Sequence, residues 1–115
     1  MPTLSVVTNV QLAPPAAVAV CKKLSVAVAR STGKPESYVT VSLRADCPLV
    51  FAGTDAPAAQ AELISIGALG GEKNKGHSRA LADVLTAELG VPANRFYIKF
   101  SDVAASDMGW NGTTF

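Results

Sequence analysis

The sequence predicts an α/β fold in which two β-α-β repeats form one four-stranded mixed sheet with two helices on one face. The first observation behind this is that strand-like and helix-like segments alternate along the chain. The second is an internal repeat: the offset that carries Gly33-Lys34-Pro35 onto Gly90-Val91-Pro92 also carries Val6-Val7-Thr8 onto Leu63-Ile64-Ser65. The length of 115 residues suits a single domain, which we place at residues 1–115.

The first repeat begins with Leu4–Thr8, a β-branched run that predicts a strand. Pro14 and the proline after it open a helix, and Gly33 ends it. The apolar positions of this helix recur at helical spacing, at Ala17, Cys21, Leu24 and Val28. Tyr38–Leu43 alternates as a second strand, with Pro48–Phe51 as a short continuation.

The second repeat begins with Ala61–Ile66, a third extended segment that the following glycines end. A second helix follows and closes at Gly90. Its apolar stripe consists of Leu81, Val84, Leu85 and Leu89. Phe96–Phe100 is the last long strand, and the tail Asp107–Phe115 is expected to be a packed loop or a short strand.

Composition excludes several function classes. With 49% hydrophobic and 17% charged residues and a net charge of +1, the chain is neither disordered nor a typical nucleic-acid binder. Prolines and lysines interrupt the apolar stretch Leu12–Ala29, so it predicts neither a membrane helix nor a signal peptide. We therefore expect a cytoplasmic protein that does not act at a membrane, with secretion that needs no signal peptide as the alternative.

Residues that often carry chemistry predict little here. Cys21 and Cys47 form no CxxC pair, so we expect small buried thiols rather than a metal site or a disulfide. Gly67–Gly71 lacks the context of a phosphate loop, and no cofactor is expected. His77 has no partner at suggestive spacing and is interpreted as a surface or capping residue.

The uncovered face of the predicted sheet suggests self-association. The mean hydropathy of +0.28 indicates more apolar surface than a small domain readily buries, and we expect the uncovered face to carry Leu, Val, Ile and Phe. Such a face would be buried between subunits, which predicts a symmetric homo-oligomer.

Pro2 is the strongest candidate for catalysis. Methionine before proline is normally removed, which would leave Pro2 with a free secondary amine. An α-amino group titrates near ~7.7–8.0, so modest burial or a nearby cation makes it a neutral base at physiological pH. The alternative interpretation is that proline is merely a common second residue.

Five short motifs occur in order at Met1–Leu4, Thr32–Pro35, Ser65–Gly67, Arg95–Ile98 and Gly109–Phe115. Together they resemble the macrophage migration inhibitory factor and D-dopachrome tautomerase family, whose members use an amino-terminal proline. The resemblance runs from end to end. It implies a homotrimer in which three sheets form the wall of a central barrel.

The resemblance also implies roles for individual residues. Pro2 would be the general base that moves a proton between the enol oxygen and the adjacent carbon of a phenylpyruvate-like or dopachrome-like substrate. Lys34 would pair with the substrate carboxylate and disfavour protonation of Pro2. Ile66 would offer its backbone amide to the same carboxylate.

Further substrate contacts are implied near the pocket wall and mouth. Tyr97 of a neighbouring subunit would line the wall, with Met108 and Phe115 near the mouth. Lys99 stands where well-studied members have an asparagine, so hydroxyphenylpyruvate is expected to be handled poorly and a more acidic substrate favoured. Ala58–Ala61 replaces the CxxC of some members, so thiol oxidoreductase activity is not expected.

Three hypotheses follow for function. The first is a homotrimeric keto–enol tautomerase that acts on a small aromatic α-keto acid. The second is a cytokine-like signalling or binding protein that has a protein receptor and a vestigial pocket. The third is an unrelated α/β binding module.

Overall fold

A computed structural model describes all residues, 1–115. The main elements are β1 (Pro2–Thr8), α1 (Pro14–Thr32), β2 (Thr40–Arg44), β3 (Ala59–Ser65), α2 (Gly71–Leu89) and β4 (Phe96–Asp102). A short hairpin, β5 (Gly109–Trp110) with β6 (Thr113–Thr114), ends the chain. Both helices and the four long strands expected in the two repeats are present, and the tail forms this hairpin, so these sequence predictions are confirmed.

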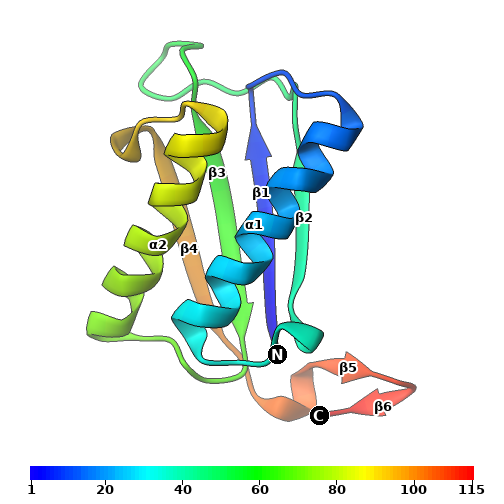
Figure 1. The fold of residues 1–115 in the computed structure, drawn as a ribbon. Helices are drawn as coiled ribbons and strands as arrows, with labels where there is room; N and C mark the ends of the chain where they lie inside the picture. Colours follow the sequence, from blue (N-terminus) through cyan, green and yellow to red (C-terminus); the bar gives the residue numbers. More distant parts are fainter.

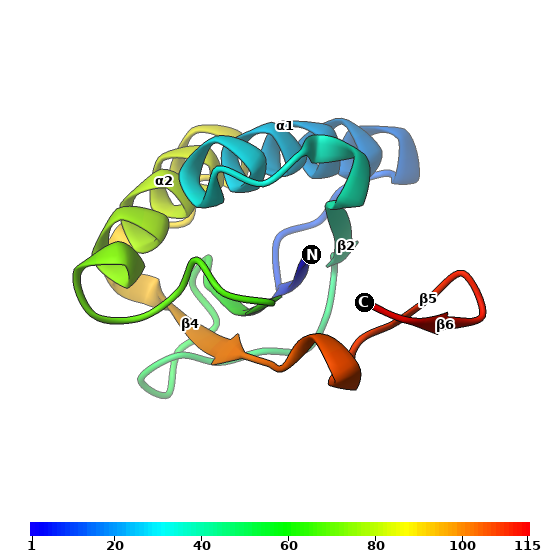
Figure 2. The same ribbon diagram turned by 90° about the horizontal axis from the view of Figure 1, so that it is seen from below.

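The four long strands form one mixed sheet in the order β2-β1-β3-β4. Within each repeat the two strands are parallel, β1 with β2 and β3 with β4, while β1 and β3 pair antiparallel at the centre. Both helices lie on the same side of the sheet (Figures 1 and 2). The predicted α/β class and layer arrangement are therefore confirmed.

The core lies between the sheet and the helices. Strand residues alternate, so every second side chain points toward the helix layer and is buried there, as Leu4, Val6 and Leu63 are. Leu24, Val28, Leu81 and Leu85 meet them from the helices. The helical periodicity and the strand alternation thus bury the same cluster from opposite sides.

The two helices end in the same way. Gly33 and Gly90 adopt left-handed φ angles of 72° and 68°, and each donates its N–H to the carbonyl four residues earlier. Glycine occupies this conformation without a steric penalty, which is why it terminates helices. The repeated Gly-x-Pro motif is therefore a repeated helix terminus.

The open face of the sheet corrects one prediction. This face carries mainly polar side chains beside three apolar or aromatic ones. The polar set is Thr3, Ser5, Thr40, Ser42, Arg44, Gln60, Glu62, Lys99 and Ser101, and the others are Val7, Ile64 and Tyr97. The expected cover of Leu, Val, Ile and Phe is wrong, because strand alternation sends most of these residues to the helix side. Hydrogen bonds such as Ser101 Oγ to Glu62 Oε2, 3.0 Å, join side chains on this face.

Three smaller predictions also need correction. Pro48–Phe51 is not a strand, since only an isolated bridge joins Phe51 to Thr54. Cys21 and Cys47 are free but half-buried rather than buried. His77 is 3% exposed, so its assignment to the surface or to a helix cap is wrong.

Candidate active site

Pro2 opens strand β1 with its ring completely buried on the helix side of the sheet. Its register partner across the antiparallel pair is Ser65, the last residue of β3. The Ser65 hydroxyl is also fully buried and has no hydrogen-bond partner. A buried polar group without a partner is costly, so an orphaned hydroxyl opposite Pro2 is a feature of a site.

Lys34 is positioned by the end of helix α1. The left-handed Gly33 turns the chain, and the Lys34 N–H then donates to Thr32 Oγ1 at 3.3 Å. Pro35 restricts the preceding residue to extended backbone. Burial, and secondly the charge of Lys34, lower the pKa of the terminal amine of Met1 below its ordinary value. The Lys34 ammonium itself forms no ion pair within the chain.

Ile66 begins the turn that follows β3. The carbonyl before it, from Ser65, accepts from Val103 N–H at 3.0 Å, and the amide after it, from Gly67, donates to Asp102 Oδ1 at 2.9 Å. The Ile66 N–H makes no hydrogen bond within the chain. An amide held between two anchored neighbours is free to bind an anion.

The C-terminal hairpin brings the end of the chain, Phe115, to the same end of the sheet as the N-terminus (Figure 1). Phe115 N–H donates to the Met108 carbonyl at 3.1 Å. Three rings form a cluster there: Tyr38 meets Trp110 at 5.7 Å and Phe115 at 5.8 Å between centroids, and the latter two stack. Sequence reasoning missed Tyr38 and Trp110 as site residues, although aromatic residues flanking the lysine motif and in the tail were a visible signal.

Tyr97 and Lys99 are not brought to this site by their own chain. Tyr97 pairs with Gln60, five residues along β3 from Ser65, which places it about 17 Å from Pro2 along the sheet. Its side chain is 74% exposed. Lys99 pairs with Glu62 and lies on the open face. Of the sequence-derived set, the structure thus places Lys34 and Ile66 beside the start of β1. Phe115, which is bonded to Met108, lies at the same end of the sheet (Figure 1).

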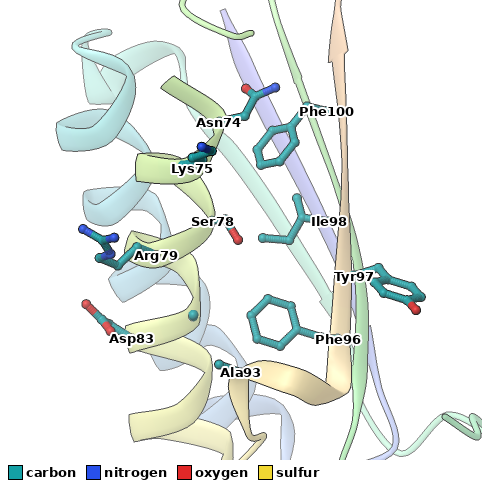
Figure 3. A pocket seen from close by; sticks show the side chains of 11 residues that line it. Asn74, Lys75, Ser78, Arg79, Asp83, Ala93, Phe96, Tyr97, Ile98 and Phe100 are labelled. Atoms are coloured by element: carbon teal, nitrogen blue, oxygen red, sulfur yellow. The ribbon is translucent and has the colours of Figure 1, made fainter. Parts of the chain in front are cut away.

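The largest groove of the single chain lies elsewhere. It has a volume of about 750 Å³ and runs between α2 and β4, where Phe96, Ile98 and Phe100 point toward the helix and Tyr97 points away (Figure 3). None of the five cavities is lined by Pro2 or Lys34. No three His, Cys, Asp or Glu side chains gather as a metal site would require. Neither helix has the length and apolar character of a membrane span.

Comparison with known proteins decides the family. The profile described as macrophage migration inhibitory factor matches residues 1–115 of the chain. The chain belongs to the macrophage migration inhibitory factor family. This family lies within the tautomerase superfamily, and the resemblance drawn from the sequence is thereby confirmed.

Individual relatives agree in sequence and in fold. A macrophage migration inhibitory factor homologue of Trichuris trichiura is 50% identical over 94 residues, 82% of each chain. The macrophage migration inhibitory factor of Xenopus tropicalis is 40% identical over 100% of this chain and 99% of that one. The crystal structure of the homologue from Prochlorococcus marinus superposes with a TM-score of 0.92 at 37% identity, covering 98% of both chains.

Proposed function

We propose that the chain is a keto–enol tautomerase for phenylpyruvate-like or dopachrome-like substrates, with the amine of Pro2 as general base. The observation that carries the proposal is the completely buried Pro2 at the start of β1, at the same end of the sheet as Lys34 and the unpaired Ile66 amide. Removal of Met1 would convert the Pro2 amide nitrogen into a basic amine.

The chemistry follows from the state of that amine. Burial disfavours the charged form, and the positive charge of Lys34 adds to this effect, so the pKa of an amine here falls below that of a free α-amino group. The neutral amine accepts the enol proton of the substrate and then donates it to the adjacent carbon, which completes the conversion to the ketone.

The substrate carboxylate supplies the anchor. Lys34 would pair with it, and the Ile66 N–H would donate to it, which fixes the reacting carbon relative to Pro2. Met108 and Phe115 would border the mouth beside the aromatic cluster. No cofactor is required, because the proton is transferred by the chain's own amine.

A homotrimer would complete the pocket. Tyr97 and Lys99 lie far from their own Pro2, and Tyr97 is exposed, so a neighbouring subunit can contribute them. Sedimentation at micromolar concentration is expected to give a single trimeric species. A stable monomer would contradict this assembly and favour an unrelated binding module.

Lys99 sets the expected substrate preference. An ammonium only donates hydrogen bonds, whereas an amide also accepts, so hydroxyphenylpyruvate should be turned over less efficiently than phenylpyruvate. Lys99→Asn is expected to reverse this order. An unchanged ratio of the kcat/KM values for the two substrates would show that Lys99 does not contact the substrate.

Pro2→Gly tests the mechanism in a phenylpyruvate tautomerisation assay. Glycine loses the ring but keeps a primary amine that can still accept a proton. We therefore expect a loss of turnover that does not exceed ~10²–10⁴-fold, the full worth of general-base catalysis. Unchanged turnover in a folded variant would contradict a specific role for the secondary amine of Pro2.

The alternative function is a cytokine-like signalling or binding protein that retains only a weak tautomerase pocket. Two observations support this alternative. The relatives are named macrophage migration inhibitory factor, and position 99 carries a lysine. It predicts negligible turnover of every aromatic α-keto acid, together with receptor binding that survives the Pro2 substitution.

A further inference from the structure

His77 is the only histidine of the chain, and it is buried on helix α2 with 3% of its surface exposed. Its ring packs against Phe100 of β4, with 6.2 Å between ring centroids. A buried imidazole loses its hydration, so a plain aromatic or aliphatic side chain would fill this space at lower cost unless the ring nitrogens are bonded.

Both ring nitrogens of His77 are bonded to other segments. Nε2 lies 2.7 Å from the carbonyl oxygen of Ala68, and Nδ1 is hydrogen-bonded to the Ser31 hydroxyl. A carbonyl can only accept, so Nε2 carries the proton. In the neutral ring Nδ1 is then the acceptor, and the Ser31 O–H donates to it.

The two partners belong to the two turns that end at the candidate active site. Ser31 lies in the last turn of α1, just before Lys34, and Ala68 lies just after Ile66. Ala68 has a left-handed φ of 65°, which is costly for a residue with a Cβ and needs support from its surroundings. No other hydrogen bond joins residues 31–34 to residues 66–70.

The turn after β3 is therefore held from two directions. Asp102 binds the Gly67 N–H from the side of β4, and His77 binds the Ala68 carbonyl from the side of α2. The free Ile66 N–H lies directly before these two anchors. Through Ser31, the same ring also holds the end of α1 that presents Lys34.

We propose that His77 is a positioning residue that sets the separation between the Lys34 ammonium and the Ile66 amide, and so controls affinity for the substrate carboxylate. This inference rests on the proposed tautomerase function. The hydrogen bonds of His77 reach α1 and the turn after β3 but not β1, which carries Pro2, so its effect falls on carboxylate binding rather than on proton transfer.

Three substitutions test the link with phenylpyruvate as substrate. His77→Phe keeps a ring of similar size and removes both hydrogen bonds. We expect KM to rise about tenfold, the equivalent of one to two hydrogen bonds, with kcat within about twofold. His77→Gln retains a donor toward Ala68 and should restore most of the affinity, while Ser31→Ala, which cuts only the link to α1, should have an intermediate effect.

Two controls separate positioning from general loss of stability. The methyl ester of phenylpyruvate keeps the enol chemistry but lacks the charge, so its KM should not respond to His77→Phe. Leu85→Ala removes a buried side chain from the same helix and should lower stability without changing the KM for the acid. Equal increases in KM for acid and ester, or an unchanged KM for the acid, would overturn the inference and leave the proposed function standing.

Amide hydrogen exchange provides a readout that needs no turnover. In His77→Phe the amides of residues 32–34 and 67–69 should exchange faster together, by at least about tenfold, and in Leu85→Ala these two turns should not respond as a pair. If the wild type fails to tautomerise any α-keto acid, the proposed function fails. The positioning role of His77 is then judged by hydrogen exchange alone. Unchanged protection of the two turns in His77→Phe would overturn that role as well.

Discussion

The two ends of the sheet treat their polar groups differently. At the end where β1 finishes, Asn9 donates through its amide to the carbonyls of Leu49, Asp55 and Ala56 and accepts from Ala58 N–H at 2.9 Å. Arg95 adds bonds to four carbonyls of the same loops and lies over the Phe51 ring. The side-chain donors of Asn9 and Arg95 are thus used to hold loops of the chain itself.

At the opposite end, where β1 begins, polar groups remain free. The Ser65 hydroxyl, the Ile66 N–H and the Lys34 ammonium have no hydrogen-bond or ion-pair partner in the chain. Folding usually satisfies buried polar groups, so the buried Ser65 hydroxyl, with the other two unpaired groups at the same end, supports the proposal that a ligand binds here. The comparison teaches that side chains at one end hold loops and those at the other are available for chemistry.

Blocking the Pro2 nitrogen should have the largest effect at the open end. A chain that keeps Met1 has an amide at this position, and an amide is not a base. We expect kcat/KM for phenylpyruvate to fall by ~10²–10⁴-fold with unchanged thermal stability. Intact mass shows whether Met1 is retained. Full activity in a preparation that retains Met1 would contradict a role for the Pro2 amine as the base.

Asn9→Ala should have the largest effect at the saturated end. Loss of its bonds to three carbonyls and one amide is expected to lower the free energy of unfolding by about 2–3 kcal/mol, while kcat/KM stays within about twofold. Denaturant titration measures it. Asn94→Ala, an exposed neighbour of Arg95 with no side-chain hydrogen bond, serves as the matched control. Lost activity at unchanged stability would reverse the assignment of the two ends.

Lys34→Ala should combine a binding effect with a shift in pH dependence. Loss of the carboxylate partner is expected to raise KM about tenfold, which corresponds to about 1.4 kcal/mol. The ammonium opposes protonation of the terminal amine, so its removal raises the pKa of that amine. The rising limb of the pH profile of kcat/KM should therefore move to higher pH. An unshifted limb would show that Lys34 does not affect the pKa of the catalytic amine.

Ser65→Ala should have the smallest effect, and unlike Asn9→Ala it should increase stability. Removing a buried hydroxyl that has no partner is expected to raise the free energy of unfolding by about 1 kcal/mol in the chain that retains Met1. Calorimetry of that form is the measurement. A destabilised variant would show that the hydroxyl is already satisfied.

The fold was predictable because each element carries its own local signal. Gly33 and Gly90 mark helix ends, and the run Phe96–Phe100 identifies the last long strand. The polar character of the open face could also have been predicted from the sequence, since Thr40, Ser42 and Arg44 alternate with apolar residues. The expected strand at Pro48–Phe51 failed because β-structure needs a partner, and none lies beside this segment within the chain.

The candidate site was predictable only in part. Pro2 was a candidate from its position after the initiator methionine, whereas Lys34 and Ile66 were found through resemblance. The grouping of the three depends on which strands pair, which no single motif specifies. The role of His77 could not be seen, because its two partners, Ser31 and Ala68, are brought to it by the packing of α1 and of the turn after β3. Burial of a helix residue near a terminus is decided by tertiary contacts rather than by spacing.

The position of the two termini constrains how the molecule can be fused or labelled. Pro2 and Phe115 lie at the same end of the sheet (Figures 1 and 2). An affinity tag placed before Pro2 would convert its nitrogen to an amide, and a fluorescent fusion after Phe115 would crowd the aromatic cluster. The solvent-facing side of α1, at Val18 with 54% exposure, is a better attachment point for a dye or a surface linker.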